Sequence, residues 1–422
     1  MIKKIYTMIL FIVSPFFLYK LYKRKKGVPS FGPRWKEHFG FTPKLASKEP
    51  PLWIHAVSVG ESIAIIPLVK ALKKRTPGQP ILITTTSSTG AAQIKKLGQL
   101  VEHRFMPLDF SFAVKSFLVA TTPKRLLIVE TELWPNTLDT VKKFGIPISV
   151  INARLSEKSY HNYTRIQPLF NLMKDNIDQL LCQTIEDASR FNLLGIDESK
   201  ISTTGSIKFD IQVPPNTKVK GQELRNKLGT KRKIWIAAST HKGEEDIVLL
   251  AHKRLMKSNP NALLIIVPRH PERFEEVNQL CNRHGFETVR RSSNKGVLSS
   301  TQVYLGDSMG EMLVFLSAAD ACFMGGSLAG SKVGGHNILE PAALGTPIVT
   351  GVSYYNFNEI VSNMLLSKGI IIVEDELSLS NTMSKLLNSW DTCTTMAKSA
   401  SVIVKKNQGS IQKTIHNLDL KK

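Results

Sequence analysis

Cysteine is scarce in this sequence of 422 residues, and its four cysteines form no pair. They stand at positions 182, 281, 322 and 393, far apart and without a Cys-x-x-Cys motif. This spacing is typical of reduced thiols in a cytoplasm. The ten histidines include no HExxH motif and no cluster with cysteine, so neither a structural zinc nor a zinc-hydrolase site is indicated. We expect no bound metal.

Acidic residues are outnumbered, with 34 Asp and Glu against 56 Lys and Arg, which gives a formal net charge of +22. Such a charge favours polyanions, namely nucleic acid, an anionic membrane surface or phosphorylated substrates. The sequence lacks the interleaved aromatic residues and the recognisable module of a nucleic-acid-binding protein. Only the charge supports that alternative, which tight, salt-sensitive RNA binding would revive, and we expect no nucleic-acid partner.

No small-residue cleavage site follows the apolar run Ile5–Tyr22, so the N-terminus does not resemble a secretory signal. Lys3 and Lys4 precede the run and the basic cluster Lys23–Lys26 follows it. This pattern predicts a membrane anchor over residues 1–22, which either spans the membrane or lies in its interface. The basic cluster favours a body on the cytoplasmic side. A buried N-terminal helix is the alternative.

Short β-rich apolar runs alternate with amphipathic helical stretches in both halves of the chain, and 42% of the residues are hydrophobic. The pattern predicts two α/β domains, each a doubly wound parallel sheet. We expect the domains at 23–212 and 226–400, joined by a proline- and lysine-rich linker at 213–225, and a C-terminal helix at 401–422 that packs back on the first domain. The expected strands are 52–56, 81–85, 125–129, 148–152, 179–183, 234–238, 263–267, 303–305, 321–324, 347–350 and 370–373.

Ligands of such sheets bind beyond the carboxyl ends of the strands, so two facing domains would form a central cleft. Glu61 follows the first expected strand and could act as a base, or could simply be a glutamate at a helix N-terminus. Glu130 follows another strand, and Lys208 lies near the linker. These two residues either serve the chemistry or form an ordinary ion pair.

The loops of the second half carry candidate nucleotide ligands. Arg269 is the best phosphate ligand, because a guanidinium fork matches phosphate oxygens. Met309–Glu311 either line a base pocket or begin a helix. Paired glycines at 334 and 335 precede a short helix, where backbone amides favour an anion and Glu340 can accept ribose hydroxyl protons.

These motifs, in this order, resemble those of the Kdo transferases, membrane-associated GT-B glycosyltransferases that attach 3-deoxy-D-manno-octulosonic acid (Kdo) to the lipid A precursor. The similarity spans nearly the whole chain. The matching motifs are HAVSVGE at 55–61, ETELWPN at 130–136, NARLS at 152–156, TGSIKFD at 204–210, STHKGEE at 239–245, VPRHPERF at 267–274, GDSMGE at 306–311 and GGHNILEPAALG at 334–345. The loop 328–333 departs from the family pattern in being longer.

The resemblance implies a GT-B fold with an acceptor-binding first domain and a nucleotide-sugar-binding second domain. It implies Glu61 as the general base, with Glu130 and Lys208 stabilising the transition state of an inverting displacement. It also implies CMP-Kdo as the donor, with no metal or other cofactor. The implied CMP-binding residues are Pro268, Arg269, Met309, Gly310, Glu311, Asn337, Ile338, Leu339 and Glu340.

The implied acceptor is a phosphorylated lipid in the cytoplasmic leaflet of the inner membrane. A single N-terminal anchor with basic flanks, together with a cationic body, would hold the enzyme on that anionic surface. The cluster Lys23–Lys26 and the segment Gly32–Phe41 are the expected contacts. A related transferase that uses another nucleotide sugar is the nearest alternative, and inhibition by CMP but not by UDP would separate the two.

Overall fold

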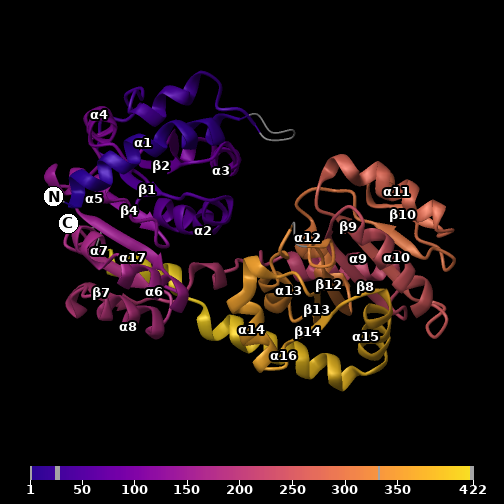
Figure 1. Cartoon of the computed structure of the whole chain (residues 1–422). Helices are drawn as coiled ribbons and strands as arrows, with labels where there is room; N and C mark the ends of the chain where they lie inside the picture. The colour runs from indigo at the N-terminus through magenta and orange to yellow at the C-terminus, as the bar shows by residue number, and fades with distance from the viewer. Residues whose placement is uncertain (1, 24–28, 331–332, 419–422) are drawn as a thin grey trace. The chain divides into compact units, whose positions relative to one another are not determined.

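The computed structural model describes residues 2–23, 29–330 and 333–418 and divides into two compact units (Figure 1). The first unit contains Met1–Asp210 together with Asn407–Lys422, and the second contains Ile211–Lys406. Each unit is built on one seven-stranded sheet in which every strand pair is parallel. The α/β class and the two doubly wound sheets expected from the sequence are therefore confirmed.

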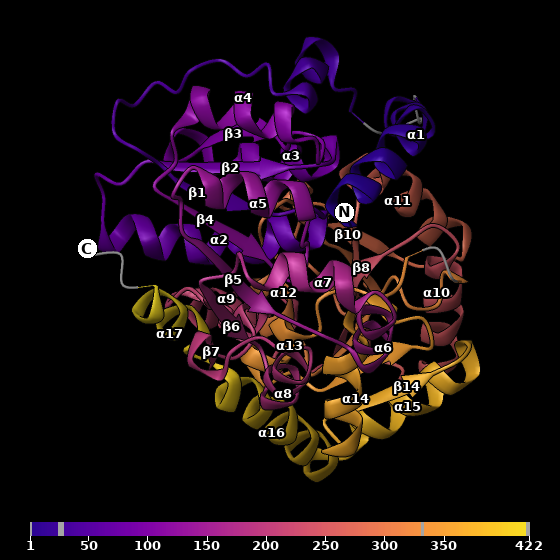
Figure 2. The same cartoon turned by 60° about the vertical axis from the view of Figure 1, so that its left-hand side comes forward.

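The first sheet has the strand order β3-β2-β1-β4-β5-β6-β7, and Figure 2 gives a second view of its strands. Alternate residues of a strand point to opposite faces of the sheet, so a sheet covered on both faces needs apolar residues at every position. Strand β1 shows this pattern, because Trp53 packs into the core on one face while Leu52 and Ile54 pack into the core on the other. All three side chains are fully buried.

The strands of the first unit are β1 (Leu52–His55), β2 (Ile81–Thr85), β3 (Glu102–Phe105), β4 (Arg125–Val129), β5 (Ile148–Ala153), β6 (Gln179–Cys182) and β7 (Ile201–Thr203). Its α-helices are α1 (Ile2–Tyr22), α2 (Val59–Arg75), α3 (Ser88–Ile94), α4 (Ser111–Thr121), α5 (Pro135–Lys143), α6 (Glu157–Arg165), α7 (Gln167–Lys174), α8 (Ile185–Leu193) and α17 (Ser410–Asn417). Short 3-10 helices are η1 (Gly32–Phe39), η2 (Lys95–Leu100), η3 (Glu198–Lys200) and η4 (Ile207–Phe209).

The second sheet has the order β10-β11-β9-β8-β12-β13-β14. Its strands are β8 (Ile234–Thr240), β9 (Leu263–Pro268), β10 (Thr288–Arg290), β11 (Val303–Leu305), β12 (Ala321–Met324), β13 (Ile348–Gly351) and β14 (Ile370–Val373). Its α-helices are α9 (Thr217–Leu228), α10 (Glu244–Leu255), α11 (Phe274–Arg283), α12 (Met312–Ala318), α13 (Leu339–Leu344), α14 (Asn358–Leu366), α15 (Glu376–Asn388) and α16 (Trp390–Asn407). The 3-10 helices are η5 (Pro271–Arg273), η6 (Arg291–Ser293) and η8 (Tyr355–Phe357).

Helix α9 occupies most of the segment 213–225 that the sequence predicts as a linker, so that prediction was wrong over these residues. Its buried face consists of Thr217, Gly221, Leu224 and Leu228. A side chain at Gly221 would collide with Ser317 of α12, so the two helices pack closely only because this position is glycine. Since two of the four buried residues are not large apolar ones, the helix shows no hydrophobic period in the sequence.

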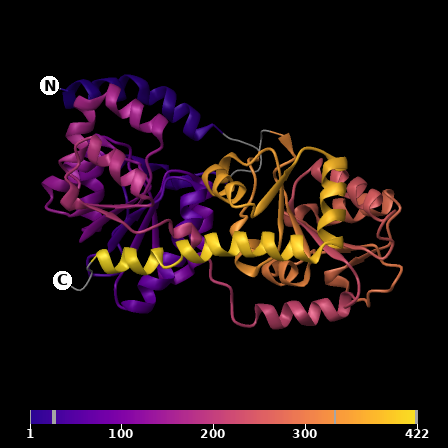
Figure 3. The ribbon, with the colours of Figure 1, turned by 90° about the horizontal axis from the view of Figure 1, so that it is seen from below.

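The C-terminal helix α17 belongs to the first unit (Figure 3). The Asp210 carboxylate accepts hydrogen bonds from the backbone amides of Gly409 and Ile411, at the start of this helix. At its end, the Arg125 side chain donates to the Leu418 carbonyl over 2.6 Å. The chain therefore leaves the first unit after Asp210 and returns to it near residue 407.

Helix α1 is docked on the first unit by one face. The Tyr6 hydroxyl donates to Asp109 over 2.8 Å, Asn136 donates to the Thr7 hydroxyl over 3.1 Å, and Lys3 forms an ion pair with Asp139. Within the residues described, no helix combines the length and the apolar character that crossing a membrane requires. Of the basic cluster Lys23–Lys26, residues 24–26 lie outside the described residues, as do residues 331 and 332 of the loop 328–333.

Candidate active site

In the first sheet, the strand order reverses between β1 and β4. Strands β2 and β3 lie on one side of β1, and the strands from β4 onward lie on the other. Doubly wound sheets bind ligands at this switch point, beyond the carboxyl ends of the two strands. Glu61 follows β1 in the first turn of α2, and Glu130 directly follows β4. The structure therefore brings both carboxylates to the switch point.

Glu61 lies in a capping box at the N-terminus of α2. Its carboxylate accepts hydrogen bonds from the Val57 amide (2.8 Å) and the Ser58 hydroxyl (2.7 Å), and only 6% of the residue is exposed. Burial raises the pKa of Glu61, these hydrogen bonds oppose the rise, and the nearby charges of Glu130 and Glu132 add to it. Glu61 thus caps a helix, and the pKa of its carboxyl group is raised.

Glu130 and Lys208 form an ion pair of 3.0 Å, and about a quarter of each side chain is exposed. The backbone of Glu130 has φ +60°, a left-handed conformation that non-glycine residues seldom adopt. Asn152, at the end of the neighbouring strand β5, also has a positive φ, and its side-chain oxygen accepts from the Ile207 amide over 3.1 Å. This contact fixes the short helix η4 that carries Lys208. Strained backbone of this kind clusters at functional sites.

The second sheet reverses between β8 and β12, and the glycine-rich loop Gly325–Leu328 follows β12. Three of its amides donate to one buried carboxylate, that of Glu244. The Glu244 oxygens accept from Gly326 (2.7 Å), Ser327 (3.0 Å) and Leu328 (2.9 Å), and also from the amide of His241 (3.2 Å). The anion that this loop binds is therefore the protein's own glutamate, so a substrate phosphate must find other ligands.

Most arginines around the carboxyl ends of β9 and β11 are already paired with acids. Arg273 pairs with Glu245 and Glu276, Arg290 pairs with Asp307, and Arg291 pairs with Glu311. Arg269 is different. It directly follows β9, its side chain is exposed, and it makes no ion pair within the part of the chain that the structure describes.

The remaining predicted nucleotide ligands surround the same edge of the second sheet. Pro268 ends β9, and Met309 and Gly310 are exposed ahead of α12. The Glu311 carboxylate is already engaged, because it accepts two hydrogen bonds from Arg291 (2.8 and 3.0 Å) and a short one from the Ser308 hydroxyl.

The segment after the paired glycines differs in detail from the expectation. Helix α13 has only six residues and starts at Leu339, and the Asn337 side chain accepts from the Leu339 amide over 3.2 Å. The side chains of Ile338 and Leu339 are buried, so these two residues can face a ligand only with their backbone. Burial raises the pKa of Glu340, which is opposed by a hydrogen bond from Asn337 and by the charge of Arg269.

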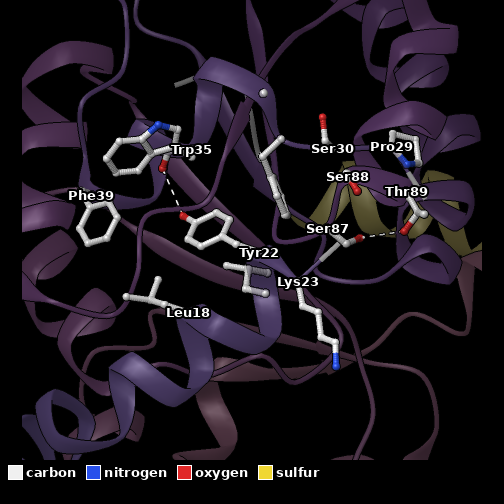
Figure 4. Close-up of a pocket in the computed structure, with 13 residues that line it drawn as sticks. Leu18, Tyr22, Lys23, Pro29, Ser30, Trp35, Phe39, Ser87, Ser88 and Thr89 are labelled. Atoms are coloured by element: carbon white, nitrogen blue, oxygen red, sulfur yellow. Dashed lines mark hydrogen bonds between the residues drawn. The ribbon is translucent and has the colours of Figure 1, made fainter. Parts of the chain in front are cut away.

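A cavity of about 750 Å³ lies in the first unit between the end of α1, η1 and the start of α3 (Figure 4). One wall carries the hydroxyl groups of Ser87, Ser88 and Thr89. This wall adjoins the loop before Glu61, because the neighbouring Thr86 hydroxyl donates to the Val57 carbonyl over 3.0 Å. The opposite, largely apolar wall is lined by Leu18, Leu21, Tyr22, Phe31, Trp35 and Phe39.

Within the described residues, no three His, Cys, Asp or Glu side chains are grouped in a way that could hold a metal ion. The first unit thus carries carboxylates and a lysine at the edge of its sheet, and the second unit separately carries an unpaired arginine with polar loop residues at the edge of its own sheet. Two doubly wound parallel sheets, each in its own unit, are the architecture of the GT-B class, to which many glycosyltransferases belong.

Comparison with known proteins agrees with this class. Residues 33–211 match the family model described as 3-deoxy-D-manno-octulosonic-acid transferase, and residues 223–402 match glycosyl transferases group 1. The 3-deoxy-D-manno-octulosonic acid transferase of Haemophilus influenzae is 37% identical over 97% of this chain and 96% of its own. The chain belongs to the Kdo transferase family, and it is an enzyme of the glycosyltransferase class.

Two solved structures are also similar. The UDP-GlcNAc 2-epimerase from Neisseria meningitidis has a TM-score of 0.56 and 15% identity over 89% of this chain and all of its own, a likeness of fold alone. The C-terminal CMP-Kdo binding domain of WaaA from Acinetobacter baumannii is 34% identical, with a TM-score of 0.43, and covers 45% of this chain and 98% of that domain.

Proposed function

We propose that this Kdo transferase moves Kdo from CMP-Kdo to a hydroxyl group of the lipid A precursor, in lipopolysaccharide biosynthesis. The observation that carries the proposal is the division of chemistry between the carboxyl edges of the two sheets. Glu61 and Glu130 flank the switch point of the first sheet, and the unpaired Arg269 follows β9 at the carboxyl edge of the second. An acceptor hydroxyl needs a base, and a departing nucleotide needs a cation.

In the proposed reaction Glu61 accepts the proton of the acceptor hydroxyl while the hydroxyl oxygen bonds to the anomeric carbon of Kdo. The bond from that carbon to the phosphate oxygen breaks, and CMP leaves with the electron pair. Glu130 and Lys208 stabilise the charges of the transition state, and Arg269 binds the phosphate. One displacement with one base inverts the anomeric centre.

A lipid acceptor is supported by the apolar wall of the cavity beside the loop that leads to Glu61 (Figure 4). An acyl chain in this cavity would lie next to hydroxyl groups that suit its polar linkage. The exposed apolar face of α1 supports attachment to the cytoplasmic face of the inner membrane, in the interfacial manner that the sequence left open. The net charge of +22 suits an anionic surface.

The test is transfer from CMP-Kdo to the purified tetra-acylated precursor in the presence of a chelator, with products resolved by mass. We expect the acceptor to gain Kdo, and the anomeric configuration of the product, read by NMR, to be opposite to that of the donor. The matched acceptor is the same phosphorylated disaccharide without acyl chains, which should react much more slowly.

Three results would contradict parts of the proposal. If folded, vesicle-bound enzyme transfers no Kdo, the proposed substrates are wrong. If it transfers Kdo equally to both acceptors, the acyl chains have no role in acceptor binding. Inhibition by UDP rather than CMP would favour a donor with another nucleotide.

A further inference from the structure

Two histidines share one hydrogen bond at the switch point of the second sheet. The Nε2 atoms of His241 and His336 are 2.7 Å apart, and the rings are nearly parallel, with an interplanar angle of 13° and centroids 4.9 Å apart. Such a bond needs one nitrogen with a proton and one with a free lone pair. One of the two Nε2 atoms therefore carries no proton. Two imidazolium ions would repel each other and could not form this hydrogen bond.

The two rings are held where a doubly wound sheet binds its ligand. His241 directly follows β8 and His336 lies in the segment between β12 and α13, and these two strands are neighbours at the switch point. The backbone of Gly326 packs on the ring of His336, because a side chain at this glycine would lie 2.7 Å from the imidazole carbon Cδ2. Glu244 accepts hydrogen bonds from the amide of His241 and from that of Gly326, the glycine that packs on His336.

Positive charge surrounds the pair and opposes a further proton. Burial is the main cause that lowers the pKa of His241 to about 4 and that of His336 to about 3, and Arg269 and His270 lower both further. The ring of His270 meets His241 edge-on, with centroids 5.3 Å apart. Arg273 also acts on His241, but it is paired with Glu245 and Glu276.

The acidic residues near the histidine pair already have other hydrogen-bond partners. The carboxylate of Glu244 accepts four backbone amides, and Glu340, which interacts with Arg269, is buried and bonded to Asn337. Glu340 thus acts on Arg269 only from a distance, Glu272 pairs with His270, and Arg269 itself forms no ion pair within the described residues. A phosphodiester bound beside Arg269 would add a negative charge next to the histidine pair, and this charge would favour the protonated form of the pair.

We propose that the His241–His336 pair is an anion-binding element of the donor site, which takes up a proton as the phosphodiester of the nucleotide sugar binds beside Arg269. In the protonated pair the Nε2 hydrogen bond is kept, and both Nδ1 atoms carry hydrogens that can be donated to anionic oxygens of the donor. This inference rests on the proposed function, and it adds a ligand and a proton to the donor site.

Proton uptake makes donor affinity depend on pH. Where the free pair is unprotonated and the bound pair is protonated, affinity rises as pH falls, by up to about tenfold per pH unit. We expect affinity to rise as pH falls from 8 to 6.5, because the bound phosphodiester raises the pKa of the pair.

The test uses the full-length enzyme and cytidine 5′-(methyl phosphate), a diester with a single charge that does not titrate between pH 6 and 8. Calorimetric titrations at pH 7 in two buffers of different ionisation enthalpy count the protons taken up, and titrations from pH 6.5 to 8 give the pH dependence. We expect a clear fraction of one proton per diester. His241→Gln and His336→Gln should each abolish the uptake and flatten the pH dependence.

His284→Gln is the matched control, because His284 bonds to Asp246 on α10 and should leave the proton count as in the wild type. Wild-type enzyme that binds the diester without proton uptake or pH dependence would overturn the inference alone, and this result needs no variant. Uptake that survives both substitutions in folded protein would overturn it as well. Wild-type enzyme that binds cytidine and the diester equally would overturn the proposed phosphate site and the inference together.

Discussion

Glu61 combines an observed role in the fold with a proposed role in the reaction. As the third residue of α2 it completes a capping box, and glutamine is also suited to this position. Exchange of Glu61 for glutamine therefore keeps the length of the side chain and an acceptor oxygen for the Val57 amide, while it removes the carboxylate. The structure thus offers a substitution that separates capping from catalysis.

We predict that Glu61→Gln lowers kcat by at least about 10²-fold, the usual contribution of a general base. Its affinity for the CMP diester should stay within about twofold of the wild type. Because burial raises the pKa of Glu61 and the base must be ionised, kcat of the wild type at saturating substrates should fall as pH drops through a value above that of an ordinary glutamate.

Asp187→Asn is the control for this prediction, since Asp187 occupies the same position in the cap of α8 and bonds to Thr184. It should lower stability without a comparable loss of kcat. A Glu61→Gln enzyme that retains a tenth of the wild-type rate would remove Glu61 from the role of base. A wild-type kcat that stays constant down to pH 4.5 would contradict the raised pKa.

Glu244 gives a second prediction, because its two oxygens serve four amides. Glutamine at this position would turn an NH₂ group towards two of them, and a buried donor without an acceptor costs about 1–3 kcal/mol. We expect Glu244→Gln to lower the melting temperature and to weaken diester binding at least tenfold, because the loop Gly325–Leu328 loses its anchor. Glu376→Gln, at the first position of α15, is the matched control and should change neither. Unchanged binding would show that this loop does not support the donor site.

At the scale of elements, the central strands could be predicted and three of the four edge strands could not. Strands such as β1, β8 and β9 are buried on both faces and therefore appear in the sequence as continuous apolar runs. Strands β3, β7 and β10 lie at sheet edges, and none of the three is fully buried. An edge strand needs few apolar residues, so hydrophobicity alone does not reveal it.

The same distinction applies to the site. Glu61, Glu130 and Arg269 could be located from the sequence, because each follows a recognisable strand and parallel strands bring their carboxyl ends to one edge. The amide partners of Glu244 could not be located from the sequence, and neither could the contact between His241 and His336. Glu244 binds amides 82–84 residues away, and His241 and His336 are separated by 95 residues. These contacts depend on the order of strands in the sheet, which no local pattern specifies.

Helix α1 carries the prediction that concerns the membrane. Lys3, Tyr6 and Thr7 make its polar contacts with the first unit, whereas Phe11, Ile12 and Phe16 are each about 70% exposed. We predict that replacing these three residues with serine lowers sedimentation with anionic vesicles several-fold, because interfacial binding scales with buried apolar area. The matched control is Ile185→Ser with Leu193→Ser on α8, which removes equally exposed apolar residues elsewhere. Equal losses of vesicle binding in both proteins would show that attachment reflects non-specific apolar contact rather than a role of α1.

At the scale of the whole molecule, the chain completes its first unit only with its last helix. Ile411, Ile415 and Leu418 are buried in the same core cluster as Leu52 and Ile54 of β1. The strand that leads to Glu61 is therefore stabilised by residues from the other end of the sequence. The second unit, with Arg269 and the histidine pair, contains no residue of this cluster within the part of the chain that the structure describes.

This arrangement predicts that the proposed base and the proposed donor ligands can be weakened separately. Ile411→Ala with Ile415→Ala should cost the first unit several kcal/mol, since a buried Ile→Ala change typically costs about 2–5 kcal/mol. Amide exchange should then quicken in β1 and β4 and stay slow in β8 and β12. Transfer should fall while affinity for the CMP diester is kept, because the proposed donor ligands and the proposed base belong to different units. Val402→Ala on α16, where the side chain is 54% exposed, should alter none of these. Parallel loss of diester binding would mean that the units unfold as one, and that the donor site depends on the first core as much as the base does.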